Sequence, residues 1–300
     1  MTLPVIPFYS HPAPAQAIHN SLSQSGFMQI SDIGIEPTLL AEVYAVSRAF
    51  FTGDQQTKSR CGYRSAQENF GYQGLLEENL DPTAPADIKE TFTMRNILTA
   101  CPDDQRWPSV AFKELMKAFY AQVLQASYAL QRVMAKQLGE AEDFFVRVHN
   151  GENISLRLLY YPAQDANSVS EGQLGAGAHT DYGFLTLLFQ DNVGGLQVLG
   201  SDNTWMDVPP EDGAVVVNSG DLLERWTNGT YRSTLHRVMP RTNGQDRLSI
   251  AMFIDPDTPT MVTPLNSCVT EDQPCRFDAI TAGEHIQTKL AASHKARFQK

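Results

Sequence analysis

The chain has 300 residues, 42% of them hydrophobic, so it is long enough and apolar enough to build a substantial core. Its 34 acidic residues outnumber the 23 basic ones and give a formal charge of −11, which argues against nucleic acid or an anionic membrane surface as a partner. The four cysteines form no CxxC pair, no segment is apolar enough to span a membrane, and the N-terminus lacks an export signal. We therefore expect a cytoplasmic protein, either a monomer or a weak dimer.

The first half of the chain is predicted to be mixed and rich in helix. Residues 5–8 form a short apolar run typical of an edge strand, and helices are expected over 15–24 and from Pro37 to Gly53. Residues 60–106 are predicted to be irregular because they are rich in Gly, Pro, Asn and Asp, and so long a segment usually either covers a functional site or is mobile. Apolar residues three and four apart then predict one long helix from Pro108 to Leu138.

From residue 154 the hydrophobic period changes to two, which is typical of strands. Turn residues separate short strands that we expect over 154–161, 184–189, 195–199, 204–208, 213–218, 231–239, 247–254 and 260–263. Such strands predict a sandwich or barrel rather than a parallel sheet with crossover helices. The tail after Cys275 has a helical pattern.

One small group of residues indicates a chemistry. The chain has no nucleophile elbow and no phosphate-binding loop, but it carries His179-Thr-Asp181 and the distant His236. Two imidazoles and one carboxylate are the ligand set of a facial triad, which holds non-haem Fe(II) and leaves its other positions open. The glycines before His179 and the strand pattern around His236 favour a metal site inside a barrel.

Arg247 and Ser249 lie two residues apart on a predicted strand, so their side chains point to the same side. A guanidinium on the inner face of such a strand needs an anionic partner, and the carboxylate of a ligand would serve. A surface salt bridge is the alternative interpretation, and the residues alone do not decide between the two.

These residues belong to a longer ordered set that resembles the isopenicillin N synthase-like family of Fe(II)- and 2-oxoglutarate-dependent oxygenases. The set comprises Leu3-Pro-Val-Ile-Pro-Phe8, Gly26-Phe-Met-Gln-Ile-Ser-Asp-Ile-Gly34, Ala49-Phe-Phe51 followed by Lys58, Asp87-Ile-Lys-Glu-Thr-Phe92, Tyr160-Tyr-Pro162, His179-Thr-Asp181, Gly195-Leu-Gln-Val198, Asn218-Ser-Gly-Asp221, Thr227-Asn-Gly229, Ser233-Thr-Leu-His-Arg-Val238 and Arg247-Leu-Ser249. The resemblance implies an α+β fold that is mostly β, with a double-stranded β-helix (jelly-roll) core flanked by α-helices, one of them long. It implies a single oxygenase domain with four parts: a mixed N-terminal region (1–106), a long-helix region (107–150), the jelly-roll core (151–265) and a helical tail (266–300).

The resemblance also implies the site. The iron centre would be the only catalytic group, and its Fe(II) ligands would be His179, Asp181 and His236. Arg247 and Ser249 would bind the distal carboxylate of 2-oxoglutarate, and Tyr161 would hydrogen-bond this co-substrate near the iron. The implied reaction uses O2 to couple oxidative decarboxylation of 2-oxoglutarate to hydroxylation, desaturation or ring closure of a small organic substrate.

Three further residues are candidates for substrate binding. Leu159 stands where many relatives carry asparagine, so Arg157 on the same strand face is a candidate to supply a polar contact, with an exposed arginine as the alternative. Phe70 and Tyr72 of the irregular segment are further substrate-binding candidates, with ordinary packing as the alternative.

Three other functions fit the same motifs. One is an oxidase that resembles isopenicillin N synthase and uses Arg-x-Ser on the carboxylate of its substrate, without 2-oxoglutarate. The second is an ethylene-forming enzyme, and the third is a non-catalytic jelly-roll sensor. Succinate release with O2 uptake, compared with ethylene in the headspace, would separate these possibilities.

Overall fold

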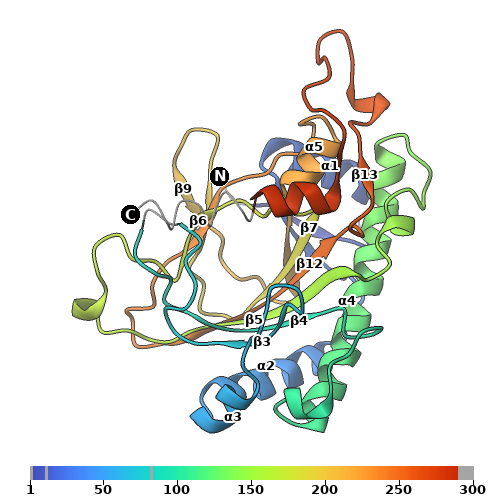
Figure 1. The fold of residues 1–300 in the computed structure, drawn as a ribbon. Helices are drawn as coiled ribbons and strands as arrows, with labels where there is room; N and C mark the ends of the chain where they lie inside the picture. Colours follow the sequence, from blue (N-terminus) through green and yellow to red (C-terminus); the bar gives the residue numbers. More distant parts are fainter. Residues whose placement is uncertain (1–2, 11–12, 82–83, 290–300) are drawn as a thin grey trace.

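The computed structural model describes residues 3–10, 13–81 and 84–289 (Figure 1). The N-terminal part consists of β1 (Val5–Pro7), α1 (Pro14–Gln24), β2 (Phe27–Ser31), α2 (Pro37–Phe51) and α3 (Gln55–Arg60). Proline stands in the first turn of α1 and of α2, where its missing N–H has no partner to lose. β1 pairs in parallel with β2 at one edge of the main sheet, as expected of an edge strand.

The segment 60–106 is more regular than its composition indicates. It contains β3 (Phe70–Gln73), β4 (Glu90–Arg95) and a short 3-10 helix (Asp104–Arg106). β4 pairs antiparallel with both β3 and β5 (Asn153–Tyr161), so this segment extends the main sheet. The predicted long helix is confirmed as α4 (Val110–Gln137), which begins after Ser109 because the Ser109 hydroxyl accepts a hydrogen bond from the Phe112 amide at 3.1 Å.

The second half of the chain supplies the rest of the sheets. It contains β6 (Ala176–His179), β7 (Leu185–Gln190), β8 (Leu196–Leu199), β9 (Trp205–Asp207), β10 (Ala214–Ser219), α5 (Asp221–Trp226), β11 (His236–Val238), β12 (Arg247–Asp255), β13 (Met261–Val262) and β14 (Ile280–Thr281). Short 3-10 helices span Val146–Val148, Ala166–Ser168 and Asn266–Cys268.

Most of these strands belong to two sheets that face one another, while β13 and β14 pair with each other in a separate two-stranded sheet. The eight-stranded sheet has the order β1-β2-β10-β7-β12-β5-β4-β3, and the four-stranded sheet has the order β6-β11-β8-β9. Side chains of both sheets meet in one small hydrophobic cluster, which includes Leu159 and Val216 of the large sheet and Leu196 and Val238 of the small one. This rolled pair of sheets is the predicted jelly-roll core.

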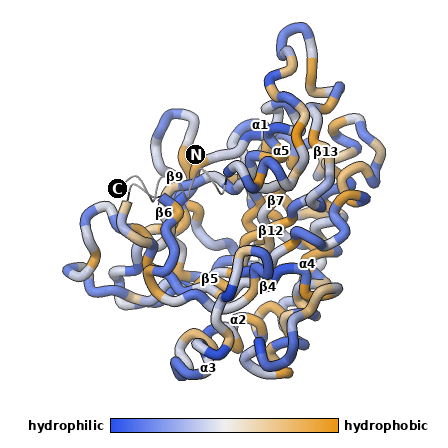
Figure 2. The backbone as a smooth tube through the Cα atoms, viewed as in Figure 1, coloured by the Kyte–Doolittle hydropathy of each residue, from blue (hydrophilic) through white to orange (hydrophobic). Residues whose placement is uncertain are grey.

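Side-chain alternation divides the two faces of the large sheet. One face packs under the helices: the ring of Phe119 on α4 lies 5.2 Å from that of Phe189 on β7, and the Tyr120 hydroxyl donates to the Ile154 carbonyl at 2.9 Å. Figure 2 shows the corresponding interleaving of hydrophobic and hydrophilic residues along α4 and the strands beneath it. The other face points into the roll, and the chemically reactive residues lie there.

Three expectations differ from the structure. The strand expected over 231–239 is limited to β11, and β6 was not expected. The predicted helical tail begins instead with a 3-10 helix and β14, and its helix covers 282–289 of the described residues, while 290–300 lie outside them. Across the described residues no helix is long and apolar enough to cross a membrane.

Candidate metal centre

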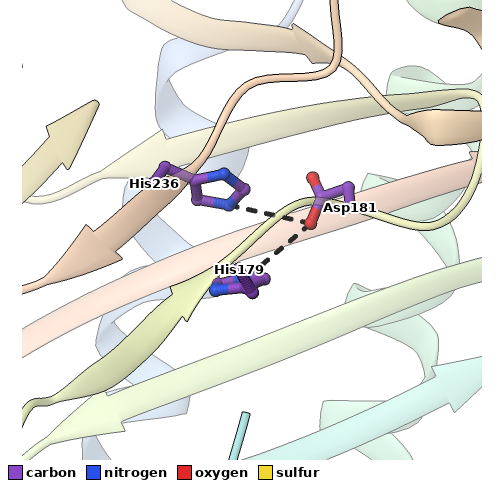
Figure 3. A group of neighbouring side chains, drawn as sticks. All are labelled: His179, Asp181 and His236. Carbon is purple, nitrogen blue, oxygen red and sulfur yellow. Dashed lines mark ion pairs between the residues drawn. The ribbon is translucent and has the colours of Figure 1, made fainter. Parts of the chain in front are cut away.

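Two histidines and one aspartate meet at the mouth of the roll. His179 ends β6 and His236 begins β11, and these two residues pair directly across the small sheet. Asp181 follows in the loop after β6, and its Oδ1 lies 3.8 Å from His179 Nε2 and 3.7 Å from His236 Nε2 (Figure 3). One ligand atom from each residue lies within 4.8 Å of the others, so the three can hold a single metal ion.

Backbone carbonyls orient both imidazoles. His179 Nδ1 donates to the Gly177 carbonyl at 2.7 Å, and His236 Nδ1 donates to the Thr234 carbonyl at 3.2 Å. Because a carbonyl can only accept, Nδ1 carries the proton and Nε2 keeps its lone pair. Both Nε2 atoms are thus available as metal ligands.

Two side chains from neighbouring strands hold the carboxylate of Asp181. Its Oδ2 accepts from Thr186 Oγ1 at 2.5 Å and from Asn218 Nδ2 at 2.7 Å. Thr186 on β7 and Asn218 on β10 lie opposite each other in the large sheet. These bonds leave Oδ1 directed at the histidines. Sequence analysis assigned neither residue a role at the metal, because only the strand register brings them together.

The protonation states suit a metal. Burial, together with the neighbouring His236, holds the pKa of His179 well below its ordinary value, so its ring is neutral. Burial alone would raise the pKa of Asp181, but His236, His179 and the hydrogen bonds from Asn218 and Thr186 lower it. A neutral imidazole and an ionised carboxylate are the forms that coordinate a divalent ion.

Arg247 lies in the same cavity and is completely buried, with 0% of its surface exposed. Its Nη1 donates to Ser249 Oγ at 2.9 Å, its Nη2 donates to Gln190 Oε1 at 3.1 Å, and its guanidinium lies 4.9 Å from the centre of the Tyr161 ring. Both hydrogen-bond partners are neutral, and Nε is buried without a partner. In the described part of the chain no carboxylate forms an ion pair with Arg247, so a surface salt bridge is the wrong interpretation.

A cavity of about 290 Å³ connects these groups. Its walls include the triad, Arg247, Ser249, Tyr161 and Leu159, and also the candidate Arg157. Arg157 is not an exposed arginine, since it pairs with the partly buried Glu78 carboxylate and donates to Thr91 Oγ1 at 3.2 Å. Arg247, in contrast, is a buried cation with no anionic partner among the described residues, which costs free energy. The cavity therefore fits a ligand that bears a carboxylate.

The other two substrate candidates lie elsewhere, and their assignment is wrong. β3 pairs with β4 so that Phe70 and Tyr72 face the helical side of the large sheet. The Phe70 ring packs 4.8 Å from that of Trp107, and the Tyr72 hydroxyl hydrogen-bonds Glu90. Neither residue lines the cavity, and ordinary packing, the alternative, accounts for both.

Comparison with known proteins agrees with this geometry. Residues 153–256 match the 2OG-Fe(II) oxygenase superfamily, and residues 3–115 match the N-terminal region described as non-haem dioxygenase in morphine synthesis. The 2-oxoglutarate-Fe(II) type oxidoreductase hxnY of Emericella nidulans is 31% identical, over 96% of this chain and 88% of that protein. The 2-oxoglutarate-dependent dioxygenase citB of Monascus ruber is 29% identical, over 94% of this chain and 90% of that protein.

Among solved structures, a full-length Neurospora crassa protein in complex with alpha-KG (2-oxoglutarate) and thymine superposes with a TM-score of 0.86 at 30% identity, over 97% of each chain. The predicted fold, cofactor and co-substrate are thereby confirmed. The chain belongs to the superfamily of 2-oxoglutarate- and Fe(II)-dependent oxygenases and is a dioxygenase of that kind.

Proposed function

We propose that His179, Asp181 and His236 bind Fe(II), that Arg247 and Ser249 bind the distal carboxylate of 2-oxoglutarate, and that the protein hydroxylates a small organic substrate. The observation that carries this proposal is the completely buried Arg247, with only neutral partners, in the same cavity as the three candidate ligands. A buried guanidinium with only neutral partners binds a carboxylate strongly, because little further desolvation of the guanidinium is needed on binding.

The donor set fits Fe(II). Two neutral nitrogens and one carboxylate oxygen on one side of the cavity would leave the remaining positions for a bidentate co-substrate and O2. When bound, Fe(II) and 2-oxoglutarate supply the oxidising chemistry, in which 2-oxoglutarate and O2 give succinate and CO2 while a substrate C–H bond becomes C–OH.

The residues of the chain then have distinct tasks. Thr186 and Asn218 hold one oxygen of Asp181, so that the other stays directed at the metal. Ser249 and Gln190 fix the Arg247 guanidinium, which sets how far the co-substrate enters. We propose that Tyr161, whose ring lies over the same guanidinium, hydrogen-bonds the co-substrate near the iron.

The alternatives are tested by the products. We expect succinate and CO2 to form in equal amounts with O2 uptake, and an added substrate to accelerate their release. Ethylene in the headspace would instead indicate the ethylene-forming reaction. O2 uptake without any requirement for 2-oxoglutarate would indicate an oxidase, and the absence of all turnover would indicate a sensor.

The assembly and location remain proposals of the same kind. We propose one oxygenase domain over 1–300, with the regions 1–106, 107–150, 151–265 and 266–300, in a cytoplasmic monomer or weak dimer. Light scattering across a concentration series would detect a stable oligomer, which would contradict the assembly, and cell fractionation would test the location.

A further inference from the structure

The cavity around the metal centre has little room for a substrate. Its volume of about 290 Å³ must hold the metal and 2-oxoglutarate, whereas sites for drug-sized ligands span about 300 to 1,000 Å³. A second cavity of about 500 Å³ lies next to it. The two share six wall residues: Leu80, Arg157, Tyr182, Phe253, Asp255 and Ile286. A substrate held at the metal would therefore extend through this shared wall into the second cavity, which we call the polar chamber.

The walls of the polar chamber are rich in hydrogen-bonding groups. Neutral polar side chains from β3, β4, β5 and the preceding loop line it, namely Tyr63, Asn69, Gln73, Thr93, Asn153 and Ser155. The acidic and basic side chains nearly balance, and Arg157 is already paired with Glu78. The remaining wall is apolar and includes Ala66, Leu80, Phe253 and Ile286. Such walls favour an uncharged molecule that carries polar groups over a strongly charged one.

Asp255 stands where the two cavities meet. It ends β12, eight residues after Arg247 and hence on the same face of the strand. Its Oδ1 accepts from the Phe184 amide at 2.9 Å, and a Cβ on residue 183 would lie 1.6 Å from that oxygen, so Gly183 makes the approach possible. No cationic side chain of the described residues forms an ion pair with it.

A carboxyl group with a single backbone partner keeps acceptor capacity, because each of its oxygens can accept more than one hydrogen bond. Burial raises the pKa of Asp255 to about 7, as expected for an enclosed carboxyl group without a cation. The metal chemistry described above does not use this group. Asp255 lines both cavities, so its unused capacity is available to a substrate that spans them.

Building on the function proposed above, we propose that the substrate spans both cavities and is a small uncharged polar molecule whose N–H or O–H group donates to the Asp255 carboxyl. Asp255 is thereby a specificity-determining residue. It selects molecules by a hydrogen-bond donor placed beyond the C–H bond that reacts, and it leaves the co-substrate end of the cavity untouched.

The test uses the full chain loaded with Fe(II) and 2-oxoglutarate and a panel of small neutral amides and alcohols. Each member is paired with its N- or O-methylated form, and apolar aromatic compounds of similar size complete the panel. Succinate release is measured for every compound. We expect at least one donor-bearing member to accelerate turnover and its methylated partner to be at least about tenfold weaker, because a site built around a hydrogen bond rejects a ligand that lacks it.

The variant Asp255→Asn sharpens the test. Its Oδ1 can still accept from the Phe184 amide, so the loop stays anchored, but an NH2 group that can only donate replaces the other oxygen. We expect the KM of the donor-bearing compound to rise at least about tenfold. The difference in turnover between this compound and its methylated form should become smaller. Asp207→Asn is the matched control, since Asp207 is exposed on β9 and bonded to Gln197. If Asp255→Asn does not fold, the paired compounds on the unaltered protein decide.

Three results would overturn the inference: equal turnover of a methylated member and its parent, turnover of apolar compounds alone, or no donor-bearing substrate although the anaerobic Fe(II)–2-oxoglutarate complex forms. Failure of that complex to form, seen as the absence of its visible absorption band, would instead remove the proposed function on which the inference rests.

Discussion

The inner face of β12 carries an ionisable side chain at each end, and these two side chains differ in their hydrogen-bond partners. Arg247 is fully buried and fixed by Ser249 and Gln190. Asp255 has one backbone partner and borders a second, polar cavity. We propose that the first end binds the carboxylate of the co-substrate and that the second accepts a hydrogen bond from the substrate. On this proposal, one strand carries both a residue that every reaction cycle needs and a residue that selects the substrate.

The candidate metal centre lines the same cavity as both ends and should give the largest effects. His179→Ala or Asp181→Ala removes a ligand from a set of three, so we expect succinate release to fall by at least about a thousandfold while the unfolding temperature changes little. His19→Ala is the control, because His19 contacts Tyr231 and does not line the cavity. Near-normal turnover by either ligand variant would remove the residue from the iron site.

The co-substrate end should respond next. Arg247→Gln leaves a ligand carboxylate without its cation, so the concentration of 2-oxoglutarate at half-maximal rate should rise about a hundredfold, corresponding to about 3 kcal/mol. Arg237→Gln provides a comparison, since Arg237 points away from the cavity, bonds Gln197 and lies 4.1 Å from the centre of the Trp205 ring. Unchanged saturation in Arg247→Gln would contradict its role.

The residues that hold Asp181 should have a smaller effect. Thr186→Val removes the hydroxyl that donates to Asp181 but conserves volume, and we expect the affinity for Fe(II) to fall about tenfold. Thr186→Ser keeps the hydroxyl and should retain most of the affinity for Fe(II). Anaerobic titration with Fe(II) measures the affinity of each variant. Equal affinities would show that this hydrogen bond does not tune the metal site.

Asp255, at the substrate end of the cavity, should also change how the stability of the protein depends on pH. Burial raises the pKa of Asp255 to about 7 in the folded protein, so its favourable contribution is complete below pH 4 and is lost as the pH rises through 7. Asparagine does not titrate. The unfolding temperature of Asp255→Asn relative to the unaltered protein should therefore rise by a few degrees between pH 5 and pH 8, measured by calorimetry. A constant difference would mean that Asp255 titrates normally.

The sequence predicted the metal ligands and Arg247 because short motifs carry them in a fixed order. It also predicted α4 and most core strands from their periodicity. Phe70 and Tyr72 were chosen because they lie in a segment that looks irregular in sequence. Its composition does not reveal that β3 joins the main sheet with both side chains on the face that the helices cover. Thr186 and Asn218 were missed because their meeting depends on the register between β7 and β10, and the enclosure of Asp255 has no local signal at all.

The most direct test of the central claim is the visible absorption spectrum of the protein with Fe(II) and 2-oxoglutarate in the absence of O2. We predict a weak charge-transfer band that saturates with the co-substrate, is lost in Asp181→Ala and needs far more 2-oxoglutarate in Arg247→Gln. No band in the unaltered protein, or an equal band in Asp181→Ala, would contradict the account.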